Sequence, residues 1–194
     1  MPVASLWDAV AAHFFTPASM SRIVAISEAE VQVEGWLKGE LIWLFGQLKD
    51  GGVIENWRCE CRIEKSSKKR LDFKLALDGK DAALEVKTAI RQQKGISYDL
   101  RWYAQQNSGF FPPDIRKLAA YPAAHRYLLV FAYPACPTSE WDEVVGELGR
   151  RVPEASVNIA KIYDSAEREI SIGWLDVKRT SEAAMERALA ASPC

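Results

Sequence analysis

Two acidic residues and one lysine near the middle of the chain have types and spacing suited to phosphoryl chemistry. Asp72 lies in the segment 71–77, and Glu85 and Lys87 lie two residues apart in the segment 82–88. Alternate side chains of a strand share a face, so Glu85 and Lys87 point the same way. Magnesium prefers carboxylate oxygens, carbonyl oxygens and water as ligands. An ammonium group beside them can orient water or stabilise charge on a phosphate. These residues indicate a magnesium-dependent hydrolytic site.

A hairpin would bring the three residues together. Apolar residues alternate with charged or small ones in the segments 57–64 and 71–77, which indicates half-buried strands. Leu71, Phe73, Leu75 and Leu77 are expected on one face, with Asp72 on the other. The composition of 78–81 is typical of a hairpin turn. This turn places Asp72 opposite Glu85 or Lys87, with Cβ atoms roughly 5 Å apart. The competing interpretation is a cross-strand charge ladder on a solvated sheet face.

The remaining elements predict a single α/β domain with a mixed central sheet flanked by helices. The composition, 48% hydrophobic and 26% charged, excludes disordered and low-complexity classes. Expected helices span 4–15, Ser27–Lys49 (with a capping box at Ser27), Pro112–Leu118, 139–150 and 181–191. Further strands are expected at 126–133, 156–163 and 169–177. The polar segment 91–113 is predicted to be a long functional loop. The unbroken apolar run 126–133 indicates a central strand covered on both faces.

Taken together, these segments resemble the PD-(D/E)xK nuclease superfamily, which has the restriction-endonuclease-like fold. The resemblance covers roughly Ser27 to Tyr133. It rests on the long helix, on Arg70-Leu71-Asp72-Phe73, on Ala83-Leu84-Glu85-Val86-Lys87-Thr88 and on Asp114-Ile115-Arg116-Lys117-Leu118. It implies a catalytic core at 27–133, extended by 134–194. The sequence departs from the family's motif at one position, because Leu71, and not proline, precedes Asp72.

The resemblance also implies roles for individual residues. Asp72, Glu85 and the backbone carbonyl of Val86 would bind magnesium, with manganese as a substitute, and Lys87 would serve the attacking water. An acid on the long helix would complete the catalytic set, and two glutamates compete for this role. At 100° per residue Glu34 and Glu40 lie about 60° to either side of Leu37, both within the apolar face. Glu40, in Gly39-Glu40-Leu41, is the preferred candidate and Glu34 the alternative.

The charge distribution favours a polyanionic partner. The net charge is −1, yet residues 56–126 hold 15 Lys and Arg against 8 Asp and Glu. One basic region within an acidic protein is expected where a single face meets nucleic acid, although a solvated basic surface has the same composition. The basic residues that follow the acidic motifs are predicted to bind nucleic acid: Arg91, Lys94, Arg101, Arg116 and Lys117. Trp102 and Tyr103 could stack on bases.

These observations predict a divalent-metal-dependent nuclease that hydrolyses DNA, in restriction, phage defence or mobile-element processing. The alternatives are a catalytically inactive nucleic-acid-binding or scaffold protein with the same fold, and an RNA-directed nuclease. Specificity is expected to come from a homodimer or a partner protein. No apolar stretch reaches the roughly 18 residues needed to cross a bilayer, and the N-terminus lacks a basic leader. We therefore expect a cytoplasmic protein without membrane contact.

Overall fold

The computed structural model describes residues 3–29, 33–62, 70–93, 95–106, 110–165, 169–179 and 181. The helices are α1 (Val3–Phe14), α2 (Pro17–Glu28), α3 (Val33–Asp50), α4 (Leu100–Gln105), α5 (Phe111–Ala120) and α6 (Thr138–Arg151). The strands are β1 (Asn56–Arg62), β2 (Arg70–Leu77), β3 (Lys80–Ile90), β4 (Gln92–Gln93), β5 (Ile96–Ser97), β6 (His125–Tyr133), β7 (Ala155–Asp164) and β8 (Ser171–Arg179). The expected helix at 181–191 lies almost wholly outside the described residues.

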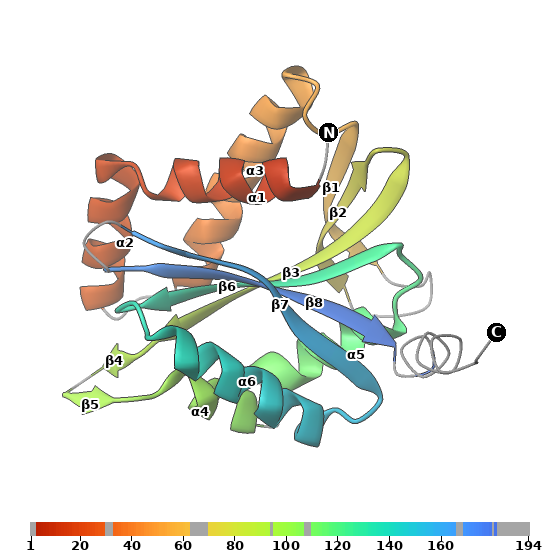
Figure 1. Cartoon of the computed structure of the whole chain (residues 1–194). Helices are drawn as coiled ribbons and strands as arrows, with labels where there is room; N and C mark the ends of the chain where they lie inside the picture. The colour runs from red at the N-terminus through yellow and green to blue at the C-terminus, as the bar shows by residue number, and fades with distance from the viewer. Residues whose placement is uncertain are drawn as a thin grey trace.

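A six-stranded mixed sheet forms the centre of the molecule, with the order β1-β2-β3-β6-β8-β7 (Figure 1). The first three strands are antiparallel, β6 runs parallel to β3, and β8 and β7 are antiparallel to their neighbours. A parallel pair needs a long crossover connection, and here it includes α4 and α5. The prediction of a single α/β domain with a mixed sheet flanked by helices is confirmed.

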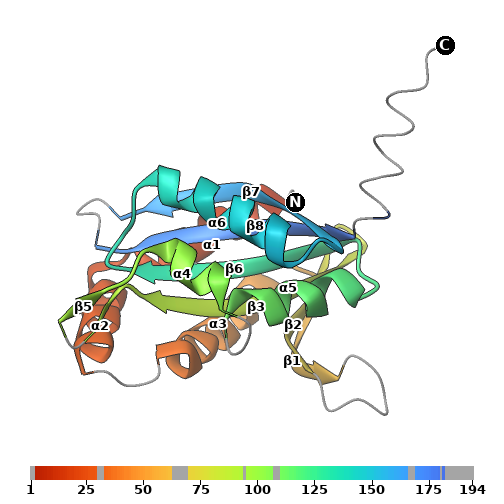
Figure 2. The same ribbon diagram turned by 90° about the horizontal axis from the view of Figure 1, so that it is seen from below.

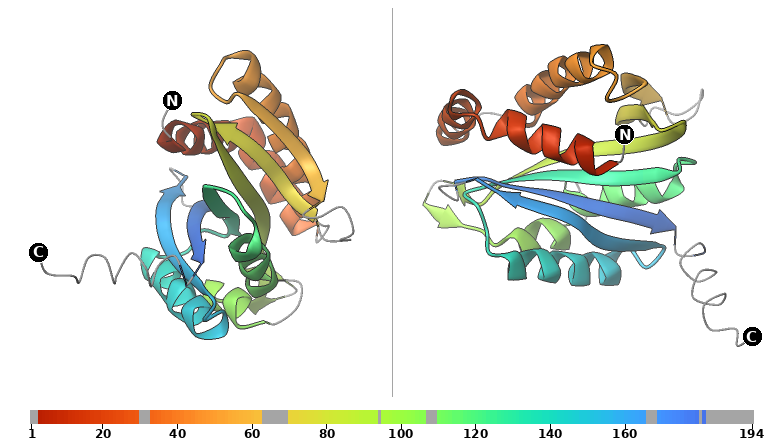
Figure 3. Two further views of the ribbon diagram at one scale, coloured as in Figure 1. Left: turned by 90° about the vertical axis from the view of Figure 1, so that its right-hand side faces the viewer. Right: turned by 45° about the horizontal axis from the view of Figure 1, so that its top comes forward.

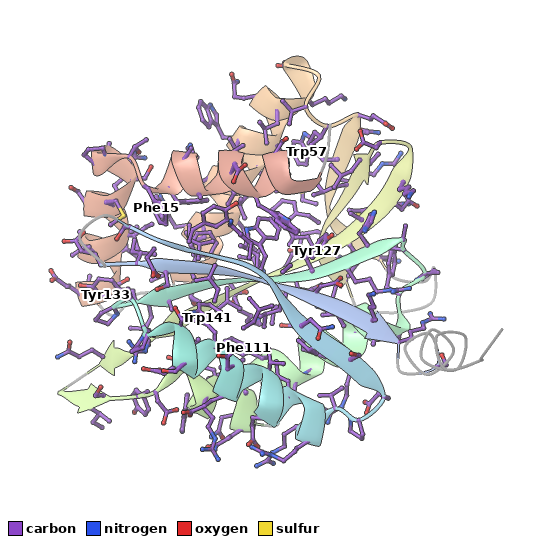
Figure 4. All side chains as sticks on the ribbon, viewed as in Figure 1. Phe15, Trp57, Phe111, Tyr127, Tyr133 and Trp141 are labelled. Atoms are coloured by element: carbon purple, nitrogen blue, oxygen red, sulfur yellow. The ribbon has the colours of Figure 1, made fainter. Side chains whose placement is uncertain are left out.

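Helices cover both faces of the sheet and enclose two apolar cores. One core lies beneath α1, α2 and α3, where Tyr127 is buried and Trp57 packs against it. The other lies beneath α4, α5 and α6 and contains Phe111 and Trp141 (Figure 4). Every residue from Arg126 to Ala132 in β6 is buried. The expectation that this strand is central and covered on both faces is confirmed.

The N-terminal region contains one helix more than the sequence analysis predicts. Pro17, which follows the helix expected at 4–15, occupies the first turn of α2, where its missing N–H removes no helical hydrogen bond. The hydroxyl group of Thr16 caps α2 by accepting a hydrogen bond from the Ser19 N–H. Ser27 lies in the last turn of α2, so the capping box predicted there is wrong. The long helix begins instead at Val33, and α3 lies alongside β1 (Figure 3).

Two strands of the antiparallel meander separate before either of them ends. Within the described chain, the ladder between β2 and β3 runs from the pair Leu77–Lys80 to the pair Phe73–Leu84. β2 then continues beside β1 to Arg70, whereas β3 continues beside β6 to Ile90. Leu71 belongs to the core on the opposite side of the sheet from Phe73. The prediction of one shared apolar face is therefore wrong at the point where the ladder stops.

The segment 91–113, expected to be a long loop, includes helices and strands among its described residues. It contains the short pair β4 and β5, then α4, which is capped by the Asp99 carboxylate accepting a hydrogen bond from the Trp102 N–H.

Among the described residues, no single helix has the length and apolar character needed to cross a membrane. Only the consecutive helices α1 and α2, bent by 69° from each other, meet those requirements as a pair.

Candidate functional site

Asp72 and Glu85 meet where β2 and β3 separate. The register of the hairpin places them opposite each other, one step beyond the last ladder pair. Each carboxylate accepts a hydrogen bond from a backbone N–H of the neighbouring strand. The Val86 N–H donates to Asp72 Oδ2 (2.8 Å), and the Asp72 N–H donates to Glu85 Oε1 (3.2 Å). Of the two expected partners of Asp72, Glu85 and Lys87, the structure therefore places Glu85 opposite it, at the end of the regular ladder.

Lys87 lies in the same cluster and is held by acids from both helical layers. Its ammonium nitrogen is 3.2 Å from Glu34 Oε2 on α3 and 3.1 Å from Asp114 Oδ2 on α5. The helices α3 and α5 cover opposite faces of the sheet, yet both contact β3 (Figure 2). Their charged side chains reach each other because β2 and β3 have separated at this point.

Two further lysines complete the cluster. Lys38 Nζ on α3 lies 2.9 Å from Glu34 Oε1 and 2.7 Å from Asp72 Oδ1. Lys117 Nζ on α5 lies 2.5 Å from Glu85 Oε2 and 3.0 Å from Asp114 Oδ1. Each lysine thus bridges two carboxylates. The hydrogen bond from the Asp72 N–H to Glu85 closes a continuous circuit, which we call the ionic ring: Asp72, Lys38, Glu34, Lys87, Asp114, Lys117 and Glu85.

Burial makes these contacts strong. The Glu85 side chain is 1% exposed and that of Asp72 is 10% exposed, so each carboxylate needs a partner to replace lost hydration. Burial, together with the charges of Asp72 and Asp114, raises the pKa of Glu85 to about 9, against the opposing effect of Lys117. Burial and the neighbouring negative charges therefore both oppose ionisation of Glu85.

The pKa values of the three lysines of the ionic ring are also raised, but for a different reason. Burial alone would lower the pKa of each ammonium group, but the neighbouring carboxylates outweigh it. Hydrogen bonds to Asp72 and Glu34 raise the pKa of Lys38. The charges of Asp114 and Glu34 raise the pKa of Lys87, and those of Glu85 and Asp114 raise the pKa of Lys117. All three lysines therefore carry a proton at neutral pH.

The oxygen donors of this site suit a hard divalent cation. Asp72 and Glu85 supply carboxylates. The N–H and C=O of a strand residue face the same edge, so the carbonyl of Val86 faces the edge from which its N–H reaches Asp72. In the arrangement described, ammonium groups lie between the acids, and no three His, Cys, Asp or Glu side chains of the described residues form a group that could hold a metal ion. A cation would have to replace an ammonium contact.

The structure separates the two glutamates that compete as the helix acid. Glu34 belongs to the ionic ring, where it contacts both Lys38 and Lys87. Glu40 lies away from it, 3.0 Å from His13 Nε2 and 3.0 Å from an Arg22 guanidinium nitrogen. The structure therefore places the alternative, Glu34, beside Lys87, and it places the preferred candidate, Glu40, in a separate cluster. The helices α1 and α2, which carry His13 and Arg22, pack on the side of α3 that bears Glu40.

Of the predicted nucleic-acid-binding residues that the structure describes, Lys117 belongs to the ionic ring, and Arg91, Arg101 and Arg116 contact acids elsewhere. Arg91 contacts Glu140 at 2.6 Å and two backbone carbonyls. Arg101 approaches Glu147, and Arg116 contacts Glu154. Lys94 lies outside the described residues. Lys117 does lie at the site, but as a partner of Glu85 and not as a free surface cation.

The aromatic residues of the same segment are packed against one another. Trp102 contacts Tyr98, Tyr103 and Phe110, with ring centroids 4.8 to 5.1 Å apart. The Tyr103 hydroxyl group donates to the Ile90 carbonyl. Their contacts are those of an intramolecular cluster, so the expected base-stacking role has no support in this arrangement.

Three members of the ionic ring were missed as site residues by sequence reasoning. The sequence analysis gives no site role to Lys38 or to Asp114, although Asp114 lies in a segment that carries the resemblance, and it assigns Lys117 only to nucleic-acid contact. The available signal was helical spacing. Glu34 and Lys38 are four residues apart on α3, and Asp114 and Lys117 are three apart on α5, so each acid and lysine share a helix face.

Comparison with known proteins yields no relative from which the site could be assigned: no family model, no curated protein and no solved structure matches this chain. The geometry of the ionic ring is therefore the basis for the proposals that follow.

Proposed function

We propose that this protein is a divalent-metal-dependent nuclease that hydrolyses DNA phosphodiester bonds. The observation that carries the proposal is the paired placement of Asp72 and Glu85 where β2 and β3 separate, with Lys87 two residues further along β3. Two buried carboxylates and one ammonium group on neighbouring strands are the arrangement that the PD-(D/E)xK resemblance implies. The order of α3, β1, β2, β3, α5 and β6 also supports the resemblance.

The residues have separable roles in this proposal. Asp72, Glu85 and the Val86 carbonyl would hold the cation, which magnesium or manganese would provide. A divalent cation bound there supplies positive charge to the phosphate and lowers the pKa of bound water. Lys87 would orient the attacking water. Its ammonium group is fixed by Glu34 and Asp114, so its position is set from both sides of the sheet.

The direct test is cleavage of supercoiled plasmid DNA by purified protein with magnesium or manganese. Glu85→Gln should abolish cleavage because it removes an anionic metal ligand with little change in shape. Asp81→Asn is a matched control: Asp81 also lies on β3 and pairs with a β2 lysine, Lys74, but its side chain is 49% exposed. We expect wild type and D81N to cleave equally.

The test also separates the alternatives. Equal cleavage by wild type and E85Q would contradict the proposed site. Absence of cleavage with either metal, combined with salt-dependent DNA binding, would favour a catalytically inactive binding or scaffold protein. Cleavage of single-stranded RNA and not of DNA would redirect the proposal to an RNA substrate.

A further inference from the structure

The Lys117 ammonium group has the contacts of a bound cation. Its three hydrogens face three oxygen acceptors: Glu85 Oε2 at 2.5 Å, Asp114 Oδ1 at 3.0 Å and the Arg70 carbonyl at 3.0 Å. The Lys117 side chain is 16% exposed. Two carboxylates and one carbonyl oxygen are also the donor types that a hard divalent cation takes. Lys117 therefore occupies an oxygen-lined position at the most buried acid of the ionic ring.

Lys117 can leave Glu85 without losing every partner. Asp114 lies three residues before it on α5, so this pair shares a helix face. The contact with Glu85 joins α5 to β3 and depends instead on the direction of a long, flexible side chain. Lys87 differs from Lys117 in this respect, because its carboxylate partners are Glu34 and Asp114 and do not include Glu85.

We propose that the Lys117 ammonium group is the resident hydrogen-bond donor to Glu85 in the metal-free protein, and that it withdraws from Glu85 when a divalent cation binds there. This inference rests on the proposed function. It makes Lys117 a positioning residue: it holds Glu85 in place before the cation arrives, and it competes with the cation for the same carboxylate. The metal affinity of the site is then set partly by the strength of the contact between Lys117 and Glu85.

The first measurement is manganese binding by calorimetry at pH 7.5, without nucleic acid. Lys117→Met removes the competing ammonium group and keeps an unbranched side chain, so it should bind manganese about tenfold more tightly than wild type. A gain of this size corresponds to the charge-assisted hydrogen bond that wild type must break. Arg116→Met is the matched control, because Arg116 precedes Lys117 on α5 and contacts Glu154, away from the ionic ring. Its affinity should change by about twofold or less, as expected for the loss of a distant, solvent-screened charge.

The second measurement uses wild-type protein, so it does not depend on the folding of a variant. A brief pulse of an amine-acylating reagent, followed by mass spectrometry, reports how accessible each lysine is. Saturating magnesium should raise the acylation of Lys117 at least about threefold, because its ammonium group loses the contact with buried Glu85. Lys74, paired with Asp81 at the other end of the hairpin, should be unchanged.

The outcomes distinguish the inference from the proposed function. If wild type binds manganese, K117M binds it no more tightly and Lys117 acylation does not rise, the inference is wrong and the proposed metal site stands. If neither wild type nor K117M binds manganese, both are wrong. Tighter binding by K117M but not by R116M, together with increased Lys117 acylation, supports the inference.

Discussion

The two ends of the β2–β3 hairpin carry similar charges in different surroundings. Near the turn, Lys74 and Asp81 form an ion pair at 2.9 Å beside a regular ladder, with side chains 36% and 49% exposed. At the other end the ladder has stopped, and Asp72 and Glu85 are 10% and 1% exposed. These two acids are partnered by two lysines, Lys38 and Lys117, and by two backbone N–H groups. Opposite charges on neighbouring strands are thus not sufficient for a site. The separation of the strands and the burial of the carboxylates distinguish the ionic ring.

The largest expected difference between the two ends is in catalysis by their lysines. Lys87→Met should lower the rate of DNA cleavage at least about 100-fold, because the ammonium group that serves the attacking water is removed. Lys74→Met removes an equal charge from the neighbouring strand and should leave the rate within about twofold. Initial rates on plasmid DNA with magnesium measure both. Equal losses in the two variants would show that the ends of the hairpin do not differ in function.

Substitutions of the two glutamates of α3 test whether a residue must belong to the ionic ring to affect the rate of DNA cleavage. Glu34→Gln weakens the hold on Lys38 and Lys87 and should lower cleavage about tenfold, which is typical of residues that orient a metal or catalytic group. Glu40→Gln affects only the cluster with His13 and Arg22, so the rate should remain within about twofold. A larger loss in E40Q than in E34Q would reverse the assignment of the helix acid.

The pH dependence of stability should differ between the buried and exposed carboxylates. The pKa of Glu85 is raised to about 9 from 4.5, so between about pH 5 and pH 9 the folded protein retains a proton that the unfolded chain has released. The free energy of unfolding should therefore fall as the pH rises through this range, by at least about 1 kcal/mol. Glu85→Gln removes this titration and should flatten the slope, whereas Asp81→Asn should retain it. Urea unfolding of metal-free protein at a series of pH values measures the slopes, and parallel curves for wild type and E85Q would contradict the account.

The smallest expected effect is on the stability contributed by the exposed pair. Lys74→Met and Asp81→Asn should each change the free energy of unfolding by about 0.5 kcal/mol or less, because solvent screens their interaction. Urea unfolding at neutral pH is sufficient to detect a larger change. A loss of about 2 kcal/mol in either variant would mean that the hairpin depends on this pair, and that the contrast with the ionic ring is overstated.

The strands of the sheet, and the placement of Asp72 and Glu85 on neighbouring strands, could be predicted from the sequence because both depend on local periodicity. Alternation in β2 and the composition of the turn at 78–81 were sufficient to place Asp72 opposite either Glu85 or Lys87. The same periodicity failed at Leu71, which faces the opposite core from Phe73. The end of a ladder depends on what surrounds the strands, and no period-2 pattern reports it.

The remaining errors have a common physical origin in contacts between distant segments. Glu34 and Glu40 lie symmetrically about Leu37 on the helix, so the packing of α1 and α2 decides between them. Arg91 was expected to face nucleic acid, but it contacts Glu140, which is 49 residues away in the chain. Helical spacing does link Lys38 to Glu34 and Lys117 to Asp114. On α3 and α5, this spacing predicts both of these pairs within the ionic ring.

The most direct test of the account is a crystal of the protein soaked in manganese and measured for anomalous scattering. We expect a peak bounded by the carboxylates of Asp72 and Glu85 and the carbonyl of Val86, with Lys117 turned away from Glu85. Manganese bound elsewhere, with the contact between Lys117 and Glu85 intact, would contradict the proposed metal site and the chemistry derived from it.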